Sequence, residues 1–258
     1  MKPSLKDMLD VAVEAAYLGG RRTLAYFNSG VAVEIKADLT PVTRADKEAE
    51  EVIRSHIARH FPDHEIIGEE GGIKKGDPSH RWIVDPIDGT KTFICGVPFY
   101  GVLIGVEVEG QASVGAVYMP AFDEMICAAT GLGCEWNGRK AAVSKTAKLS
   151  DAALLTTNIT ACQTRSDTYD RLARATKMQR TWGDCYGYAL VATGRADIML
   201  DPAMNPWDCA PMLPILREAG GHFTTWGGEP TIWGKDGCAT NGALNREVLD
   251  VLKSEKRA

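Results

Sequence analysis

The sequence WIVDPIDGT occupies residues 82–90. Its apolar beginning predicts a strand that ends at Asp85, and the proline after this aspartate fixes one backbone angle of the turn that follows. Gly89 permits a tight turn, so the carboxylates of Asp85 and Asp88 and the carbonyl of Ile87 can converge on one point. The stretch therefore predicts a cluster of oxygen atoms at the end of a strand.

Such a cluster suits a hard divalent cation. Magnesium prefers carboxylate, carbonyl and water oxygens. Gly89 and Thr90 are placed to start a helix, whose free N–H groups bind a phosphate. Two negative side chains beside a phosphate require cations between them, so the stretch predicts a metal-dependent phosphate site. Taken alone, Asp-Pro-x-Asp-Gly is also an ordinary surface turn.

Three further acidic positions accompany this stretch. Glu69, in Gly-Glu-Glu-Gly, follows a predicted strand over residues 64–67 and is expected to project into the same crevice. Asp208 follows Pro-Trp, and Asp46 lies three residues after Thr43. Each has a plainer interpretation: a solvated glutamate pair, a helix N-cap at Asp208, and a capping-box partner at Asp46.

Together, these motifs resemble the signature motifs of the inositol monophosphatase family. The matching segments are Gly68-Glu69-Glu70, Trp82-x-x-Asp85-Pro86-Ile87-Asp88-Gly89-Thr90 and Pro206-Trp207-Asp208, with Lys36-x-Asp38, Thr43-x-x-Asp46 and Glu218-Ala219-Gly220-Gly221 around them. The resemblance covers nearly the whole chain. One departure is Gly71, where many relatives have a serine, but that position is not a metal ligand.

The resemblance implies an α+β or α/β fold, a layered αβαβα sandwich of the inositol monophosphatase and fructose-1,6-bisphosphatase type. It also implies a homodimer that binds two or three magnesium ions. The implied ligands of the first ion are Glu69, Asp85 and the Ile87 carbonyl; those of the second are Asp85, Asp88 and Asp208; and Glu69 also faces a third ion.

The resemblance also implies how these residues act in catalysis. Thr90, oriented by Asp46, would position and deprotonate the attacking water, and the amides of Gly89 and Thr90 would orient the phosphoryl group. The expected activity is hydrolysis of a small phosphate monoester.

Substrate choice depends on fewer residues. The pattern around Asp184 and Asp201 is similar to the histidinol-phosphate phosphatase branch of the family. L-Histidinol phosphate carries an ammonium group and an imidazole, which two carboxylates can bind through charge-assisted hydrogen bonds. Three alternatives stay open: an inositol-1-phosphate or broad sugar-phosphate phosphatase, Asp184 as a mere N-cap of the helix from Cys185, and a binding protein without activity. The last predicts a broken metal ligand, yet all are present.

Composition sets limits on the partners. The 258 residues carry a net charge of -5, which argues against a broad basic surface for nucleic acid or anionic lipid. The seven cysteines include no C-x-x-C pair, so we expect free thiols rather than a zinc site or disulfides. The N-terminus lacks the apolar run of a signal peptide, and no apolar stretch is long enough to span a bilayer. A cytoplasmic enzyme that does not bind membranes is expected.

The periodicity of apolar residues predicts two parts. Residues 1–148 are expected to form two helices, Leu5–Phe27 and Thr43–His60, followed by a mainly antiparallel sheet that carries most metal ligands. Residues 149–258 are expected to alternate short strands with helices and to supply the substrate residues and the last ligand. One of these helices is predicted over Trp207–Ala219.

Overall fold

The computed structural model describes residues 3–254. The chain begins with two long helices, α1 (Leu5–Leu24) and α2 (Arg44–His60), as the sequence predicts. Thr43 is the N-cap of α2, and its N–H and hydroxyl both donate to one carboxylate oxygen of Asp46, at 2.8 and 2.6 Å. The predicted capping box is therefore formed. A short hairpin of β1 (Val33–Ile35) and β2 (Pro41–Thr43) joins the two helices.

Eight strands of the described residues form a large sheet. Their order is β10-β9-β8-β7-β6-β5-β3-β4, with β3 and β5 parallel and the other neighbours antiparallel. The strands are β3 (His64–Gly68), β4 (Gly72–Lys74), β5 (Asp77–Asp88), β6 (Gly101–Val108), β7 (Gln111–Met119), β8 (Glu124–Ala129), β9 (Gly133–Trp136) and β10 (Arg139–Lys140). The short helix α3 (Thr90–Ile94) leaves the end of β5.

A smaller mixed sheet of five strands follows in the order β12-β11-β13-β15-β14. Its central strands β11 and β13 are parallel, whereas β15 runs antiparallel to β13 and β14. The strands are β11 (Ala153–Thr156), β12 (Met178–Arg180), β13 (Ile198–Asp201), β14 (His222–Thr224) and β15 (Gly237–Thr240). A 3-10 turn, η1 (Leu149–Asp151), precedes the first of them.

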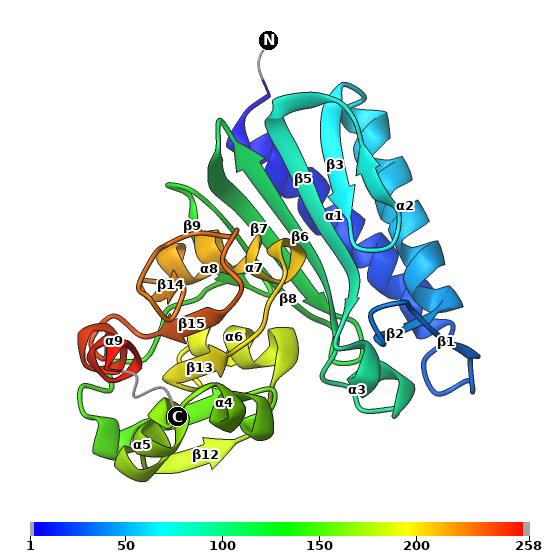
Figure 1. Ribbon diagram of the computed structural model, residues 1–258. Coiled ribbons are helices and arrows are strands. Elements are labelled where there is room, and N and C mark those ends of the chain that lie inside the picture. Colours follow the sequence, from blue (N-terminus) through cyan, green and yellow to red (C-terminus); the bar gives the residue numbers. More distant parts are fainter. Residues whose placement is uncertain (1–2, 255–258) are drawn as a thin grey trace.

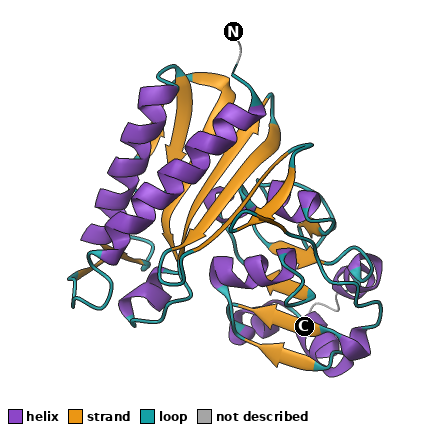
Figure 2. Cartoon of the chain, turned by 180° about the vertical axis from the view of Figure 1, so that it is seen from behind, coloured by secondary structure: helices purple, strands orange, loops and turns teal. Residues whose placement is uncertain are grey.

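The elements stack in alternating layers, which Figures 1 and 2 show from opposite sides. Helices α1 and α2 pack on one face of the large sheet. Helices α6 (Asp184–Ala192) and α8 (Met212–Glu218) fill the space between the two sheets. Helices α4 (Ile159–Arg165), α5 (Thr168–Ala175) and α9 (Asn245–Lys253) cover the outer face of the small sheet. The αβαβα sandwich expected from the sequence is therefore confirmed.

One expected element is wrong. The predicted helix Trp207–Ala219 is two helices, α7 (Pro206–Cys209) and α8, separated at Ala210 and Pro211. Proline has no N–H to donate to the preceding turn, so the first helix ends before it. Asp208 therefore lies in the short helix α7 and not in α8.

The expected division after residue 148 stays a prediction. The large sheet ends at Lys140 and the small sheet begins at Ala153, but one apolar core joins them, because Ile83 and Leu103 of the large sheet share it with Met199 of the small one. The seven cysteines are free, and five of them are buried. No helix among the described residues has the length and apolar character needed to cross a membrane.

Candidate active site

The turn after β5 brings the predicted oxygen ligands to the end of the large sheet. Pairing between β5 and β6 shifts register between Asp85 and Asp88, so the chain bulges there and the two aspartates no longer alternate across the sheet. The N–H of Ile87 donates to Asp85 Oδ1 at 2.9 Å, which fixes the buried carboxylate. Gly89 follows with φ at 83°, a left-handed conformation that favours glycine, and α3 begins at the next residue.

Three carboxylates converge at this bulge. One oxygen of each of Asp85, Asp88 and Asp208 lies within 4.8 Å of the others. Asp208 reaches them from the separate helix α7, where Asn205 N–H holds its Oδ2 at 2.7 Å. Asp88 Oδ2 accepts the N–H of Cys185 at the start of α6. Two of the acidic motifs found in the sequence, the one with Asp85 and Asp88 and the one with Asp208, therefore meet in space.

The electrostatics of this cluster favour a bound cation. Burial raises the pKa of Asp85 well above its usual value, and the charges of Glu69, Asp88 and Asp208 add to the rise. Burial also raises the pKa of Asp88, and it raises the pKa of Asp208 to about 7. Like charges in a buried site resist ionisation together, and a divalent cation between them reverses that effect. The donor set contains only oxygen, which fits magnesium.

Glu69 is a fourth acidic residue beside the cluster of Asp85, Asp88 and Asp208, and it forms an ion pair with Lys36. Lys36, in the turn after β1, places its Nζ 2.7 Å from Glu69 Oε1 and 2.9 Å from Glu70 Oε1. Burial raises the pKa of Glu69. The buried carboxylate of Glu50 accepts the N–H groups of Glu70 and Gly71, both at 2.8 Å, and so orders this loop. No motif in the sequence indicates this role of Glu50.

The predicted catalytic pair also lies at this site. Thr90 Oγ1 is 3.1 Å from the Ile87 carbonyl oxygen and 3.4 Å from Asp46 Oδ1, a long hydrogen bond. Because Thr43 occupies only the other oxygen of Asp46, the aspartate can cap α2 and orient Thr90 at once. Burial raises the pKa of Asp46. Geometry permits the predicted role of this pair, which stays a prediction.

Two of the predicted substrate residues, Asp184 and Asp201, line a small cavity beside the acidic cluster, whereas Gly89 and Thr90 do not. Its volume is about 110 Å³, and its lining includes Asp88, Asp184, Asp201 and Asp208. Asp184 is the first residue of α6 and does not cap the helix with its side chain. Asp201 is only 6% exposed, and burial raises its pKa to about 7. Binding of substrate by Asp184 and Asp201 stays a prediction.

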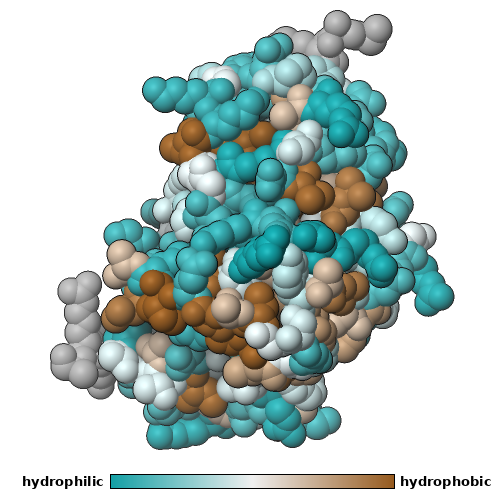
Figure 3. Space-filling model, turned by 90° about the vertical axis from the view of Figure 1, so that its right-hand side faces the viewer, coloured by the Kyte–Doolittle hydropathy of each residue, from teal (hydrophilic) through white to brown (hydrophobic). Residues whose placement is uncertain are grey.

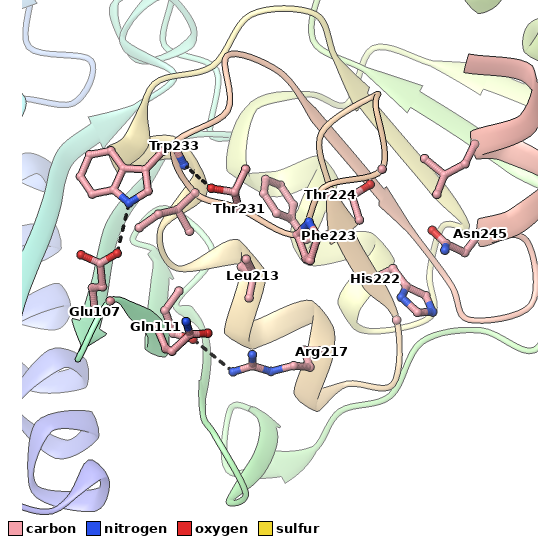
Figure 4. A pocket seen from close by; sticks show the side chains of 17 residues that line it. Glu107, Gln111, Leu213, Arg217, His222, Phe223, Thr224, Thr231, Trp233 and Asn245 are labelled. Atoms are coloured by element: carbon pink, nitrogen blue, oxygen red, sulfur yellow. Dashed lines mark hydrogen bonds between the residues drawn. The ribbon is translucent and has the colours of Figure 1, made fainter. Parts of the chain in front are cut away.

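A larger cavity lies elsewhere, about 580 Å³, between the β6–β7 hairpin and the segment before β15. Its arginine is engaged by the protein itself: Arg217 donates to the Ala112 carbonyl oxygen at 3.1 Å, drawn beside Gln111 in Figure 4, and to Thr130 Oγ1 at 2.7 Å. The one lining carboxylate, Glu107, is neutralised by Arg81 at 2.7 Å and accepts the indole N–H of Trp233 at 3.1 Å. This cavity therefore lacks the oxygen ligands of a metal site.

Comparison with known protein families is consistent with the acidic cluster at the end of the large sheet. The profile of the inositol monophosphatase family matches residues 4–256. The chain belongs to the inositol monophosphatase family. It is therefore a phosphatase, in a family whose members typically depend on metal ions.

The relatives within this family carry several names. The chain is 40% identical to a histidinol-phosphatase from Chlorobaculum parvum over 96% of this chain and 98% of the relative. It is 35% identical to a fructose-1,6-bisphosphatase/inositol-1-monophosphatase from Aquifex aeolicus over 97% of each chain. Among solved structures, the extragenic suppressor protein suhB from Bartonella henselae superimposes with a TM-score of 0.89, at 29% identity over 96% of this chain and 98% of that one.

Proposed function

We propose that this phosphatase hydrolyses L-histidinol phosphate to L-histidinol and phosphate, in the biosynthesis of histidine, and that it depends on magnesium. The observation that carries the proposal is a carboxylate, Asp184, beside Gly89 at the expected phosphate position. A Cβ built on Gly89 would lie 2.8 Å from Asp184 Oδ2, so the two groups are in close contact. A substrate bound there meets a negative side chain next to its phosphate end.

Two or three magnesium ions are the proposed cofactors. The oxygens of Glu69, Asp85, Asp88 and Asp208 and the Ile87 carbonyl would hold them. Magnesium, when bound, lowers the pKa of water and offsets the charge of the phosphate.

The protein's own groups would orient the phosphoryl group and activate the attacking water. The amides of Gly89 and Thr90, at the start of α3, would orient the phosphoryl oxygens. The Thr90 hydroxyl, which donates to Asp46 Oδ1, would hold the attacking water, take up its proton and pass its own proton to the Asp46 carboxylate.

The proposed choice of substrate follows from the negative charge of Asp184. Asp184 is partly exposed and lines the cavity, and it offers its carboxylate to the ammonium or imidazolium of L-histidinol phosphate. Inositol offers only hydroxyl groups and gains nothing from that charge. Relatives named histidinol-phosphatase at 40% and 36% identity support the same substrate.

An inositol-1-phosphate or broad sugar-phosphate phosphatase is the second candidate. The relative from Aquifex aeolicus with a double name favours it. The variant Asp184→Asn separates the two candidates because it removes the charge and keeps the size of the side chain. It should impair hydrolysis of the cationic ester and leave that of the neutral ester near the wild-type rate.

The test is phosphate release from L-histidinol phosphate and inositol 1-phosphate, side by side, with magnesium and with a chelator. A magnesium-dependent preference for L-histidinol phosphate supports the proposal. A preference for inositol 1-phosphate keeps the metal chemistry and rejects the substrate. Equal loss on both esters in Asp184→Asn rejects the role of Asp184.

We also propose a homodimer. Figure 3 shows apolar side chains gathered in the lower half of the face that lies on the right in Figure 1. Exposed apolar residues occur in the segments that meet at Asp184, namely Ile94, Ile159 and Trp182. Light scattering on the wild type and on Trp182→Glu measures the assembly, and a wild-type monomer would reject it.

A further inference from the structure

The backbone of Asp184 has an uncommon conformation. Its φ is 49°, in the left-handed region that residues with a side chain seldom adopt. The N-cap of α6 is Gly183, and the carboxylate of Asp184 is bound by Thr92 of another helix. A conformation of this kind persists only where neighbouring groups fix it, and such positions cluster at functional sites.

Two threonines supply that restraint from opposite sides. Thr157 Oγ1 accepts the N–H of Asp184 at 2.8 Å, and Thr92 Oγ1 donates to Asp184 Oδ2 at 2.8 Å. Thr157 directly follows β11 of the small sheet, whereas Thr92 lies in α3 at the end of the large sheet. The backbone and the carboxylate of Asp184 are thus tied to different layers of the sandwich.

Two glycines make room for this arrangement. A Cβ on Gly183 would lie 2.4 Å from Thr157 Cα, and a Cβ on Gly89 would lie 2.8 Å from Asp184 Oδ2. A side chain at either position would force the aspartate or its partner to move. The carboxylate is therefore seated directly against the turn that precedes α3.

Asp201 stabilises the same arrangement through a hydrogen bond to Thr157. Its Oδ1 accepts the N–H of Thr157 at 3.1 Å, and its Oδ2 accepts the hydroxyl of Tyr188 at 3.0 Å. Both oxygens of this buried carboxylate are therefore engaged by the protein itself. Asp201 fixes the backbone of Thr157, whose hydroxyl in turn fixes the backbone of Asp184.

We propose that Thr157 and Thr92 are positioning residues that hold the Asp184 carboxylate beside Gly89, where it selects a phosphate ester carrying a positive charge. The inference rests on the proposed function and adds to it the residues that set its selectivity. Asp201 acts through Thr157. Without either threonine, the carboxylate leaves the place where it meets a cationic substrate, but the metal ligands and the phosphate-binding turn stay intact.

The test uses the full-length protein with magnesium and four variants. Thr157→Val and Thr92→Val remove one hydroxyl each with little change in volume, and Thr157→Ser keeps the acceptor. Thr160→Val, at an exposed position of α4, is the matched control. KM and kcat are measured on L-histidinol phosphate and on inositol 1-phosphate, below the melting temperature of each variant.

Both valine variants should raise KM for L-histidinol phosphate by about tenfold and change KM for inositol 1-phosphate by less than about twofold. Thr157→Ser and Thr160→Val should match the wild type. An equal rise on both esters, no rise at all, or a failure of Thr157→Ser to restore binding would overturn the role of the threonines.

The wild type separates this inference from the function on which it rests. A wild type without preference for L-histidinol phosphate refutes the substrate and, with it, the selectivity. A wild-type preference that survives in both valine variants refutes the positioning role alone and leaves the proposed function standing.

Discussion

Replacing Asp88 with asparagine should stabilise the metal-free protein and abolish its activity. The two side chains have nearly the same shape, and the asparagine oxygen can still accept the N–H of Cys185. The substitution therefore removes a negative charge and little else. A residue with a purely structural role would give the opposite sign, because loss of its contacts would destabilise the fold.

The magnitude follows from the spacing of the charges. Two full charges no more than 4.8 Å apart repel, and at an effective dielectric constant near 20 the repulsion is at least about 3 kcal/mol. Because the pKa of Asp208 is about 7, this group is partly protonated near neutral pH, and burial raises the pKa values of Asp85 and Asp88 as well. We therefore expect a smaller gain of about 1–2 kcal/mol, equivalent to roughly 2–8 °C in melting temperature.

The pH dependence of this gain has a definite sign. A carboxyl group whose folded pKa lies above its unfolded value of about 3.9 contributes stability below that value and loses it as the pH rises through the folded pKa. For Asp208 that pKa is about 7. The gain from Asp88→Asn should therefore increase between pH 5 and pH 8, where the repelling charges of the wild type develop.

The assay is thermal unfolding of the wild type and Asp88→Asn, in chelator and in magnesium, together with phosphate release. Magnesium should raise the melting temperature of the wild type more than that of the variant. The variant Glu51→Gln, which removes an exposed charge from α2, should change neither stability nor activity. A metal-free Asp88→Asn protein that melts below the wild type, or one that keeps full activity, would refute the reasoning.

Three further predictions concern the surroundings of the site. Gly89→Ala should destabilise the protein by about 1–2 kcal/mol, because φ is positive at this position. It should also lower activity, because the new Cβ would contact Asp184. Unchanged urea unfolding and unchanged turnover would contradict this prediction. Burial lowers the pKa of His64, whose Nδ1 accepts the indole N–H of Trp82 at 3.0 Å. The unfolding free energy should therefore fall as the pH drops below about 6.5. An equally steep fall in the variant His64→Gln, measured in magnesium, would disprove that cause. Lys36→Met should bind magnesium more tightly in calorimetry, because it removes a positive charge that lies against the acidic lining, and weaker binding would count against that argument.

Features decided by neighbouring residues were predictable from the sequence. The capping box depends only on Thr43 and on Asp46, three positions later. The left-handed conformation of Gly89 follows from a turn between a strand and a helix. The alternation of helices and sheets, and hence the layered fold, followed from periodicity and from the resemblance to a known family. The gathering of Asp85, Asp88 and Asp208 was expected from the same resemblance, and the structure brings them together.

Features decided by distant residues were not predictable. Helical periodicity over Trp207–Ala219 hid the break at Pro211, because a proline is tolerated in the first turn of a new helix. The bond from Asp184 to Thr157 spans 27 residues, and the bond to Thr92 spans 92. No local pattern marks such partners, since one threonine lies in the short helix α3 and the other in the loop after β11.

The placement of these bonds separates the chemistry from the choice of substrate. Most metal ligands lie in one turn at the end of the large sheet, next to α7, and they depend on the bulge after Asp85. The proposed substrate cavity is lined by residues of α6, of β13 and of the segment after β11, and it meets the acidic cluster at Asp88 and Asp208. A change in the loop after β11 can therefore alter the preferred ester without a direct contact to the acidic cluster, whereas the start of α6 also contacts that cluster through the Cys185 N–H bond to Asp88. This arrangement gives a physical reason why one family includes proteins named for histidinol phosphate, inositol phosphate and fructose bisphosphate.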